Sequence, residues 1–181
     1  REGYREFIRL VKRMLKLMGC LLVIVAGGGA GYLQARKLSM RVRFLEQYLK
    51  WVSQMETEIR YGSEDISRLL GRHRQQLSAL SFLTQCTDQM KKGIPFPQAW
   101  KEAIREIPRE YGLKPDDLEA VQAFGNGLGT SDVDGQTAHC RMHQKLLQSR
   151  LKGAQEEKQR KGKLYFMLGL CLGVSVALLI A

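Results

Sequence analysis

Two uncharged apolar stretches, one near each end of the chain, constrain the fold more than any other feature of the sequence. Residues 17–33 and residues 164–181 contain no Asp, Glu, Lys or Arg. A helix needs roughly 20 apolar residues to cross the hydrocarbon core of a bilayer, which is about 30 Å thick. Both stretches come close to that length, so the sequence predicts two transmembrane helices, at residues 17–33 and 164–181.

A cleavable signal peptide is the alternative interpretation of the first stretch, because basic residues precede it and small residues follow it. Residues 31–35 offer no clear small-x-small cleavage site, and a helical pattern continues beyond them. We therefore favour an uncleaved first span.

The positions of the basic residues predict how the chain lies in the membrane, because Lys and Arg are retained on the cytoplasmic side. The formal net charge is +11, with six basic residues in the tail, residues 1–16, and none after the second span. Twelve more flank the central segment: Arg36, Lys37, Arg41, Arg43, Lys50, Lys145, Arg150, Lys152, Lys158, Arg160, Lys161 and Lys163. Residues 34–163 are therefore expected in the cytoplasm and both termini outside. The basic tail opposes this orientation less if translation starts at Met14.

Glycines recur four residues apart in both apolar stretches. Gly27 and Gly31 have this spacing in the first, and Gly169 and Gly173 have it in the second. Small residues at this spacing let two helix backbones approach closely in lipid. We predict that these four glycines are transmembrane packing positions. A phosphate-binding loop would need a preceding strand and a following Lys-Ser or Lys-Thr, which the sequence lacks.

Apolar residues alternate at spacings of three and four after the first span, as in a helix that packs against other helices. They are Leu38, Val42, Leu45, Leu49, Val52, Met55 and Ile59. The first span is therefore expected to continue as one helix into the central segment. No segment alternates with a period of two. We predict an all-α protein, in which residues 34–163 form an antiparallel helical bundle between two transmembrane helices.

Gly, Pro and capping residues divide the rest of the central segment. Helices are expected at residues 64–70, 79–92 and 97–107, then from Pro115, and finally after the possible caps at residues 130–132.

A metal site is one possible chemistry for the last helix, because His139 and His143 lie four residues apart with Cys140 between them. A metalloprotease would need Glu after the first His, and a structural zinc site would need two further ligands. His73 and Cys86 are candidates for those ligands, but nothing in their spacing supports them. We therefore predict no metal, no catalytic residue and no cofactor.

Neither glycines nor basic residues of the central segment form a known ligand-binding pattern. Gly125, Gly127 and Gly129 resemble a dinucleotide loop, but that loop follows a strand, whereas these glycines follow a predicted helix. We interpret them as a turn. The basic run at residues 72–74 is short, and aromatic residues do not alternate with basic ones as in single-strand binders. Nucleic acid is therefore not expected as a partner.

The two long helices are expected to turn at one membrane-distal end. Residues 36–61 would rise roughly 40 Å as a single helix, and the last helix must descend a similar distance from Asp132. We name the residues at these two turns the distal tip residues and predict that they bind a soluble partner. They are Tyr61, Gly62, Glu64, Gly125, Gly127, Gly129 and Asp132. The alternative is that these glycines only end helices.

Several short segments resemble the stage III sporulation protein AB family of endospore-forming bacteria. They are MLKLMG at residues 14–19, QARKL at 34–38, ETEIRYG at 56–62, FGNGLGTSD at 124–132, and Gln136. The resemblance covers residues 14–181 and leaves residues 1–13 without a counterpart, in keeping with a start at Met14. SEDI at residues 63–66 departs from the family pattern.

The resemblance implies a function that the residues alone do not show. The family is similar to the cytoplasmic helical domain of the platform protein in type II secretion and type IV pilus machines. This implies a non-enzymatic membrane platform in the channel between mother cell and forespore. The implied partners are a secretion-type ATPase (stage III sporulation protein AA), other membrane and ring components, and lipid. A membrane-tethered metal-binding or nucleic-acid-binding protein is the alternative.

Overall fold

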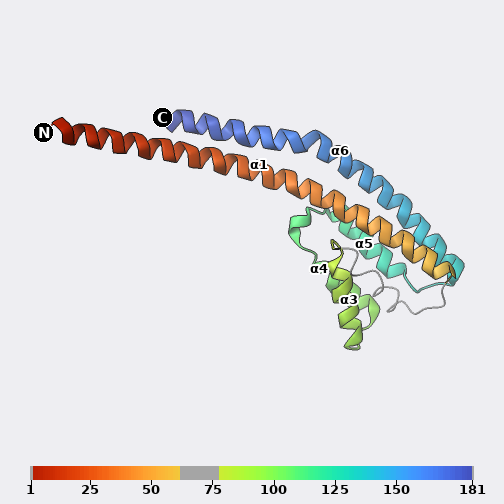
Figure 1. The fold of residues 1–181 in the computed structure, drawn as a ribbon. Coiled ribbons are helices and arrows are strands. Elements are labelled where there is room, and N and C mark those ends of the chain that lie inside the picture. The colour runs from red at the N-terminus through yellow and green to blue at the C-terminus, as the bar shows by residue number, and fades with distance from the viewer. Residues whose placement is uncertain (1, 62–77, 181) are drawn as a thin grey trace. The chain divides into compact units, whose positions relative to one another are not determined.

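The computed structural model describes the backbone of residues 2–61 and 78–180, and every regular element in these ranges is a helix. Two of the helices are long. In chain order the elements are α1 (Glu2–Tyr61), α3 (Ser81–Lys91), α4 (Phe96–Arg105), the 3₁₀ helix η1 (Arg109–Tyr111), α5 (Pro115–Gly127) and α6 (Val133–Ile180) (Figure 1). The predicted all-α class is confirmed.

The chain divides into two compact units. Residues 1–38 and 157–181 form the terminal unit, and residues 39–156 form the central unit. Both long helices contribute to both units, since α1 supplies the first residues of each and α6 the last. The prediction that the first apolar stretch continues as one helix to Tyr61 is confirmed.

No helix in the described part of the chain combines the length and the apolar character needed to cross a membrane. The two transmembrane helices therefore stay a prediction from the sequence. The predicted helix at residues 64–70, Gly71 and the basic run at 72–74 lie outside the described residues.

Within the central unit, α1 and α6 run antiparallel. The Glu56 carboxylate on α1 accepts hydrogen bonds from Arg141 and Gln144 on α6, both at 2.8 Å. Earlier on α1, Glu46 accepts a 3.3 Å hydrogen bond from Gln155, which lies later on α6. In Figure 1, α6 runs alongside this part of α1.

The core of the central unit is built on an aromatic face of α1. Phe44, Tyr48 and Trp51 are fully buried. Their rings contact the other helices: Tyr48 meets Phe124 of α5 edge to face at 6.1 Å, and Trp51 stacks on Trp100 of α4 at 6.1 Å. Aromatic pairs in such arrangements add roughly 0.5–1.5 kcal/mol each beyond the area they bury.

The predicted apolar seam of α1 is only part of its buried surface. Four residues of the seam are buried as expected, and three are half-buried. The buried ones are Val42, Leu45, Val52 and Met55, and the half-buried ones are Leu38, Leu49 and Ile59. The aromatic face lies beside this seam, so α1 is covered over a wider arc than a two-helix seam requires.

Turn residues set the short helices as expected. Gly93, two residues after the end of α3, adopts φ +88°, a left-handed conformation that favours glycine. Pro97 lies in the first turn of α4 and Pro115 in that of α5, where a missing backbone N–H costs nothing. The 3₁₀ turn at Arg109–Tyr111 was not predicted.

An ion pair fastens α5 to α1 inside the central unit. Asp117 is completely buried and Arg41 is 5% exposed. Arg41 donates from Nε to Asp117 Oδ2 at 2.7 Å and from its terminal nitrogen to Oδ1 at 3.1 Å. The backbone N–H of Lys114 also donates to Asp117 Oδ2, at 2.9 Å. Arg41 is thus part of the core, although its sequence position indicated a basic residue flanking a membrane span.

Candidate functional site

The four glycines predicted to pack together meet in the terminal unit. A Cβ added at Gly27 would lie 2.5 Å from the carbonyl oxygen of Gly169 and 3.2 Å from Cα of Gly173. A Cβ added at Gly169 would fall against the carbonyl oxygen of Gly27, 3.2 Å from Cα of Gly31. These neighbours are backbone atoms, so a side chain at either position must push the two helices apart.

The neighbouring glycines of the same run do not take part in this contact. A Cβ at Gly28 or Gly29 would meet nothing within 4 Å among the described residues. Of this glycine run, only the face of α1 that carries Gly27 and Gly31 therefore packs against α6. The role of this crossing inside a bilayer stays a prediction.

In the central unit, Gly125 makes room for a buried aromatic side chain. A Cβ at this position would overlap the indole ring of Trp100. The ring is fixed there because Trp100 Nε1 donates a 3.1 Å hydrogen bond to the carbonyl oxygen of Val121. Gly125 is itself buried within α5. It is a packing position and offers no surface to a partner.

Gly127 has a similar function at the last residue of α5. A Cβ there would overlap the imidazole ring of His139. That ring stacks on Phe124, with centroids 5.4 Å apart, and its Nε2 lies 2.9 Å from the carbonyl oxygen of Phe124. Gly129 serves the turn instead, because its φ of +80° is left-handed.

Gln136, which the sequence marked only through the family resemblance, organises the loop between α5 and α6. Its Oε1 accepts a 2.9 Å hydrogen bond from the N–H of Gly129. Its Nε2 lies 3.0 Å from both the carbonyl oxygen of Gly127 and Oγ of Ser131. The buried side chain of Gln136 therefore fixes the conformation of this largely exposed loop through hydrogen bonds.

Asp132 caps α6, as one of the three predicted alternatives. Its Oδ1 accepts a 2.9 Å hydrogen bond from the N–H of Gly135. Such a cap satisfies one of the free N–H groups at a helix start and contributes about 1 kcal/mol.

The distal tip residues fall into three groups. Gly125 and Gly127 pack inside the unit. Tyr61 at the end of α1 is exposed, as are Gly129 and Asp132 in the loop between α5 and α6. Gly62 and Glu64 lie outside the described residues. The last turn of α1 and the first turns of α6 lie at one end of the central unit (Figure 1), where Arg141 reaches Glu56. We call the exposed loop at residues 129–132, together with Tyr61, the distal surface.

A charged junction supports this end. Glu56 accepts hydrogen bonds from Gln144 and Arg141 of α6 and from Arg60 of α1. Partial burial raises the pKa of Glu56, but these donors and the charges of the two arginines outweigh it, so the net pKa lies below its ordinary value. The carboxylate is therefore ionised at neutral pH.

The histidine pair belongs to the core. The rings of His139 and His143 are 4.5 Å apart, and His143 is only 3% exposed. Burial and the neighbouring His139 lower the pKa of His143 to about 4. Burial raises the pKa of the Cys140 thiol to about 11. Among the described residues, no three His, Cys, Asp or Glu side chains gather into a metal-binding group.

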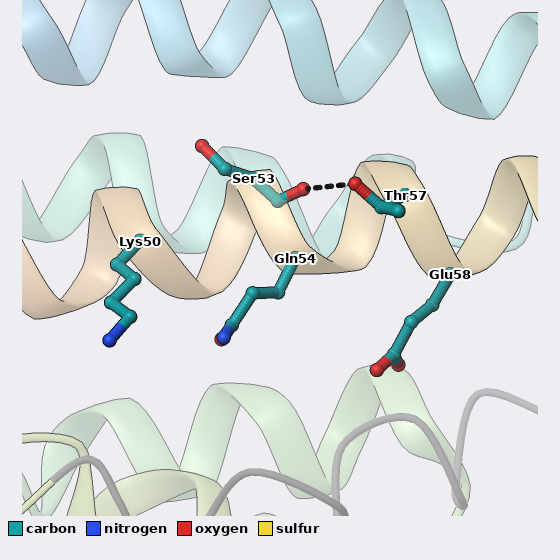
Figure 2. Close-up of a pocket in the computed structure, with 5 residues that line it drawn as sticks. All are labelled: Lys50, Ser53, Gln54, Thr57 and Glu58. Carbon is teal, nitrogen blue, oxygen red and sulfur yellow. Dashed lines mark hydrogen bonds between the residues drawn. The ribbon is translucent and has the colours of Figure 1, made fainter.

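Two surface pockets of the central unit were not predicted. A pocket of about 370 Å³ lies along α1, where Figure 2 shows Lys50, Gln54 and Glu58 extending from one face, with Ser53 and Thr57 nearby. The Thr57 hydroxyl donates to the carbonyl oxygen of Ser53 at 3.2 Å. The polar residues at 50, 54 and 58 share a helix face by their spacing, which is the signal that could have revealed this pocket.

The second pocket has a volume of about 400 Å³ and lies where α1, α5 and α6 meet. Its lining residues come from all three helices. They are Arg41, Lys114, Asp116, Leu146, Ser149, Arg150 and Gly153. Two of its three basic side chains are ion-paired within the chain, Arg41 with Asp117 and Arg150 with Asp116.

Comparison with known proteins identifies the family. The stage III sporulation protein AB of Bacillus subtilis (strain 168) is 25% identical over 170 residues, which cover 92% of this chain and 99% of that protein. No solved structure matches the chain. The family model described as stage III sporulation protein AB matches residues 16–181. This match extends over far more than half of the sequence, so the chain belongs to the stage III sporulation protein AB family.

Proposed function

We propose that the chain is a membrane-anchored platform in a secretion-like channel complex between mother cell and forespore, required for endospore formation. The observation that carries this proposal is the pairing of α1 with α6. Each helix has a part packed in the central unit and a part rich in apolar residues that belongs to the terminal unit. One helix pair would thus both anchor and position the folded domain.

The anchor consists of residues 17–33 and 164–181, each spanning the membrane once. Close approach of Gly27 to Gly169 supports a paired anchor, because lipid offers little hydrophobic drive for helix association and backbone contact supplies packing energy instead. The basic residues around the central segment support a location of residues 34–163 in the cytoplasm of the mother cell.

The platform docks a secretion-type ATPase, stage III sporulation protein AA, at the distal surface. No Walker sequence occurs in the chain, so ATP hydrolysis belongs to the partner. The hydrogen bonds of Gln136 and the cap by Asp132 support this location, because they hold an exposed loop in one conformation before any partner arrives. Preorganisation of this kind lowers the ordering cost of binding. Other membrane and ring components of the complex contact the anchor.

Topology is the direct test. In a chain whose four cysteines are replaced by alanine, Ser78→Cys places one thiol on the exposed surface of the central unit. An impermeant maleimide should label this thiol only after the membrane of mother-cell protoplasts is opened. Labelling of intact protoplasts would reject the cytoplasmic orientation. A matched thiol at residue 181, which is expected outside the membrane, should label in intact protoplasts.

A further inference from the structure

One face of α6 in the central unit carries an exposed stripe of apolar and small residues. Met142, Leu146, Ser149 and Gly153 follow one another at spacings of four, three and four, so they share one side of the helix. Met142 is 58% exposed and Leu146 is 38% exposed. We call these four residues the α6 stripe.

Gly153 has no packing role within the described part of the chain. A Cβ added there would meet nothing within 4 Å, in contrast to Gly125 and Gly127. Glycine within a helix costs about 1 kcal/mol of stability relative to alanine. Gly153 therefore destabilises α6, and no close packing contact that needs a glycine compensates for this cost. Small residues do, however, allow a second helix to approach closely.

Basic residues flank the stripe, with the exposed Glu156 as an acidic exception near Gly153. Lys145 and Lys152 are exposed along one edge of it. On the other edge lies the 400 Å³ pocket, which shares Leu146, Ser149 and Gly153 with the stripe and has Arg41, Lys114 and Arg150 in its wall. In that wall Arg150 pairs with Asp116 at 2.8 Å and Arg41 pairs with Asp117 at 2.7 Å. The exposed basic charge beside the stripe therefore comes mainly from Lys145 and Lys152.

We propose that the α6 stripe docks an acidic amphipathic helix from a different protein. Apolar side chains of that helix cover Met142 and Leu146, its backbone approaches at Ser149 and Gly153, and its carboxylates face Lys145 and Lys152. Charge complementarity selects this occupant. A second copy of the chain carries the same basic edges and a formal net charge of +11, so it would place like charges together.

This surface is separate from the distal surface and extends the proposed function by a second partner. Its test does not require the ATPase contact to exist. Photo-cross-linking in sporulating cells, with a benzophenone amino acid at Leu146 of the full chain, captures whatever covers the stripe. Mass spectrometry of the adduct then identifies the cross-linked peptide.

The expected adduct is a peptide with apolar residues at helical spacing and an excess of Asp and Glu. Two changes should each reduce its yield by about ten-fold or more, since they alter the centre of the contact. Gly153→Leu blocks close approach, and the double variant Lys145→Glu/Lys152→Glu reverses the edge charge. The matched control, Lys92→Glu/Lys101→Glu, makes the same charge change at exposed positions elsewhere and should leave the yield unchanged.

Other outcomes overturn the proposal. An adduct with the same chain assigns the stripe to self-association, and an adduct with lipid or with a basic peptide assigns it to another occupant. Absence of any adduct from a chain that folds, as shown by its circular dichroism, also rejects it. Equal yields from Gly153→Leu and the unsubstituted chain reject the stripe as the contact.

Discussion

Asp117 of α5 and Arg41 of α1 form a two-point ion pair inside the central unit, although 76 residues separate them in the sequence. Removing one charge of such a pair leaves the other buried without compensation, at a cost of about 3–5 kcal/mol. Asp117→Asn should therefore destabilise the central unit by this amount. Urea unfolding of the full chain in detergent, followed by fluorescence of its two tryptophans, measures the loss.

The neighbouring aspartate provides the control for this prediction. Asp116 is exposed and pairs with Arg150 at the surface, so Asp116→Asn should change the midpoint very little. Equal effects of the two substitutions would show that the buried pair contributes no more to the free energy of unfolding than the surface pair.

Substitutions at Gly27 and Gly28 should differ in effect although the residues are adjacent. Gly27→Leu inserts a side chain against the backbone of Gly169, whereas Gly28→Leu faces open space. The first should lower heat-resistant spore counts by about ten-fold or more, because it blocks the close approach of the two helices. The second should sporulate normally. Similar spore counts for both variants would show that the contact between Gly27 and Gly169 is not needed for assembly.

The sequence predicts contacts that depend on local spacing better than contacts that depend on distant partners. Gly27, Gly31, Gly169 and Gly173 were found from four-residue intervals, and the helix caps from single turn residues. Burial of Arg41 could not be predicted, because its partner is 76 residues away and basic residues beside an apolar stretch usually flank a span.

The aromatic face of α1 was missed for a related reason. A search for spacings of three and four selects one seam, whereas α1 is covered by several helices and buries Phe44, Tyr48 and Trp51 as well. The glycines of the α5–α6 region were recognised as special, but only the structure assigns Gly125 to Trp100 and Gly127 to His139.

A pair of glycine-to-alanine changes separates packing from surface roles. Gly125→Ala should destabilise the central unit by about 1–3 kcal/mol, the usual cost of overpacking, because its methyl group overlaps Trp100. Gly153→Ala should stabilise it by up to about 1 kcal/mol, since the methyl group meets open space and alanine favours helix. The same urea titration measures both, and a stable Gly125→Ala protein would contradict the packing role.

The stability of the central unit should fall as the pH falls from about 6.5 to about 4, because burial and the neighbouring His139 lower the pKa of His143 to about 4 from 6.5. In that window the unfolded chain binds a proton that the folded chain excludes. A shift of this size corresponds to about 3 kcal/mol when fully expressed. His143→Met should flatten the dependence.

Glu56 acts in a lower pH window and does not obscure this test. Its pKa lies below 4.5 in the folded chain, so its contribution is complete above that pH and is lost only as the pH falls further. Unfolding midpoints at pH 7, 6 and 5 therefore isolate His143. An unchanged slope in His143→Met would place the titrating group elsewhere.

The charges of Glu64 and Asp132, two of the distal tip residues, should control binding of the ATPase more than they control stability. The double reversal Glu64→Lys/Asp132→Lys should abolish co-purification of the ATPase with the membrane complex. Loss of the Asp132 cap, in which Oδ1 accepts from the N–H of Gly135, should cost only about 1 kcal/mol.

Asp132→Ser is the matched control, because a serine hydroxyl retains the cap and removes the charge. If charge matters, Asp132→Ser should reduce co-purification while the tryptophan unfolding midpoint stays unchanged. If only loop geometry matters, Asp132→Ser should bind normally and Gln136→Ala, which releases Gly127, Gly129 and Ser131, should not. Undiminished ATPase recovery from all three variants would move the contact away from the distal surface.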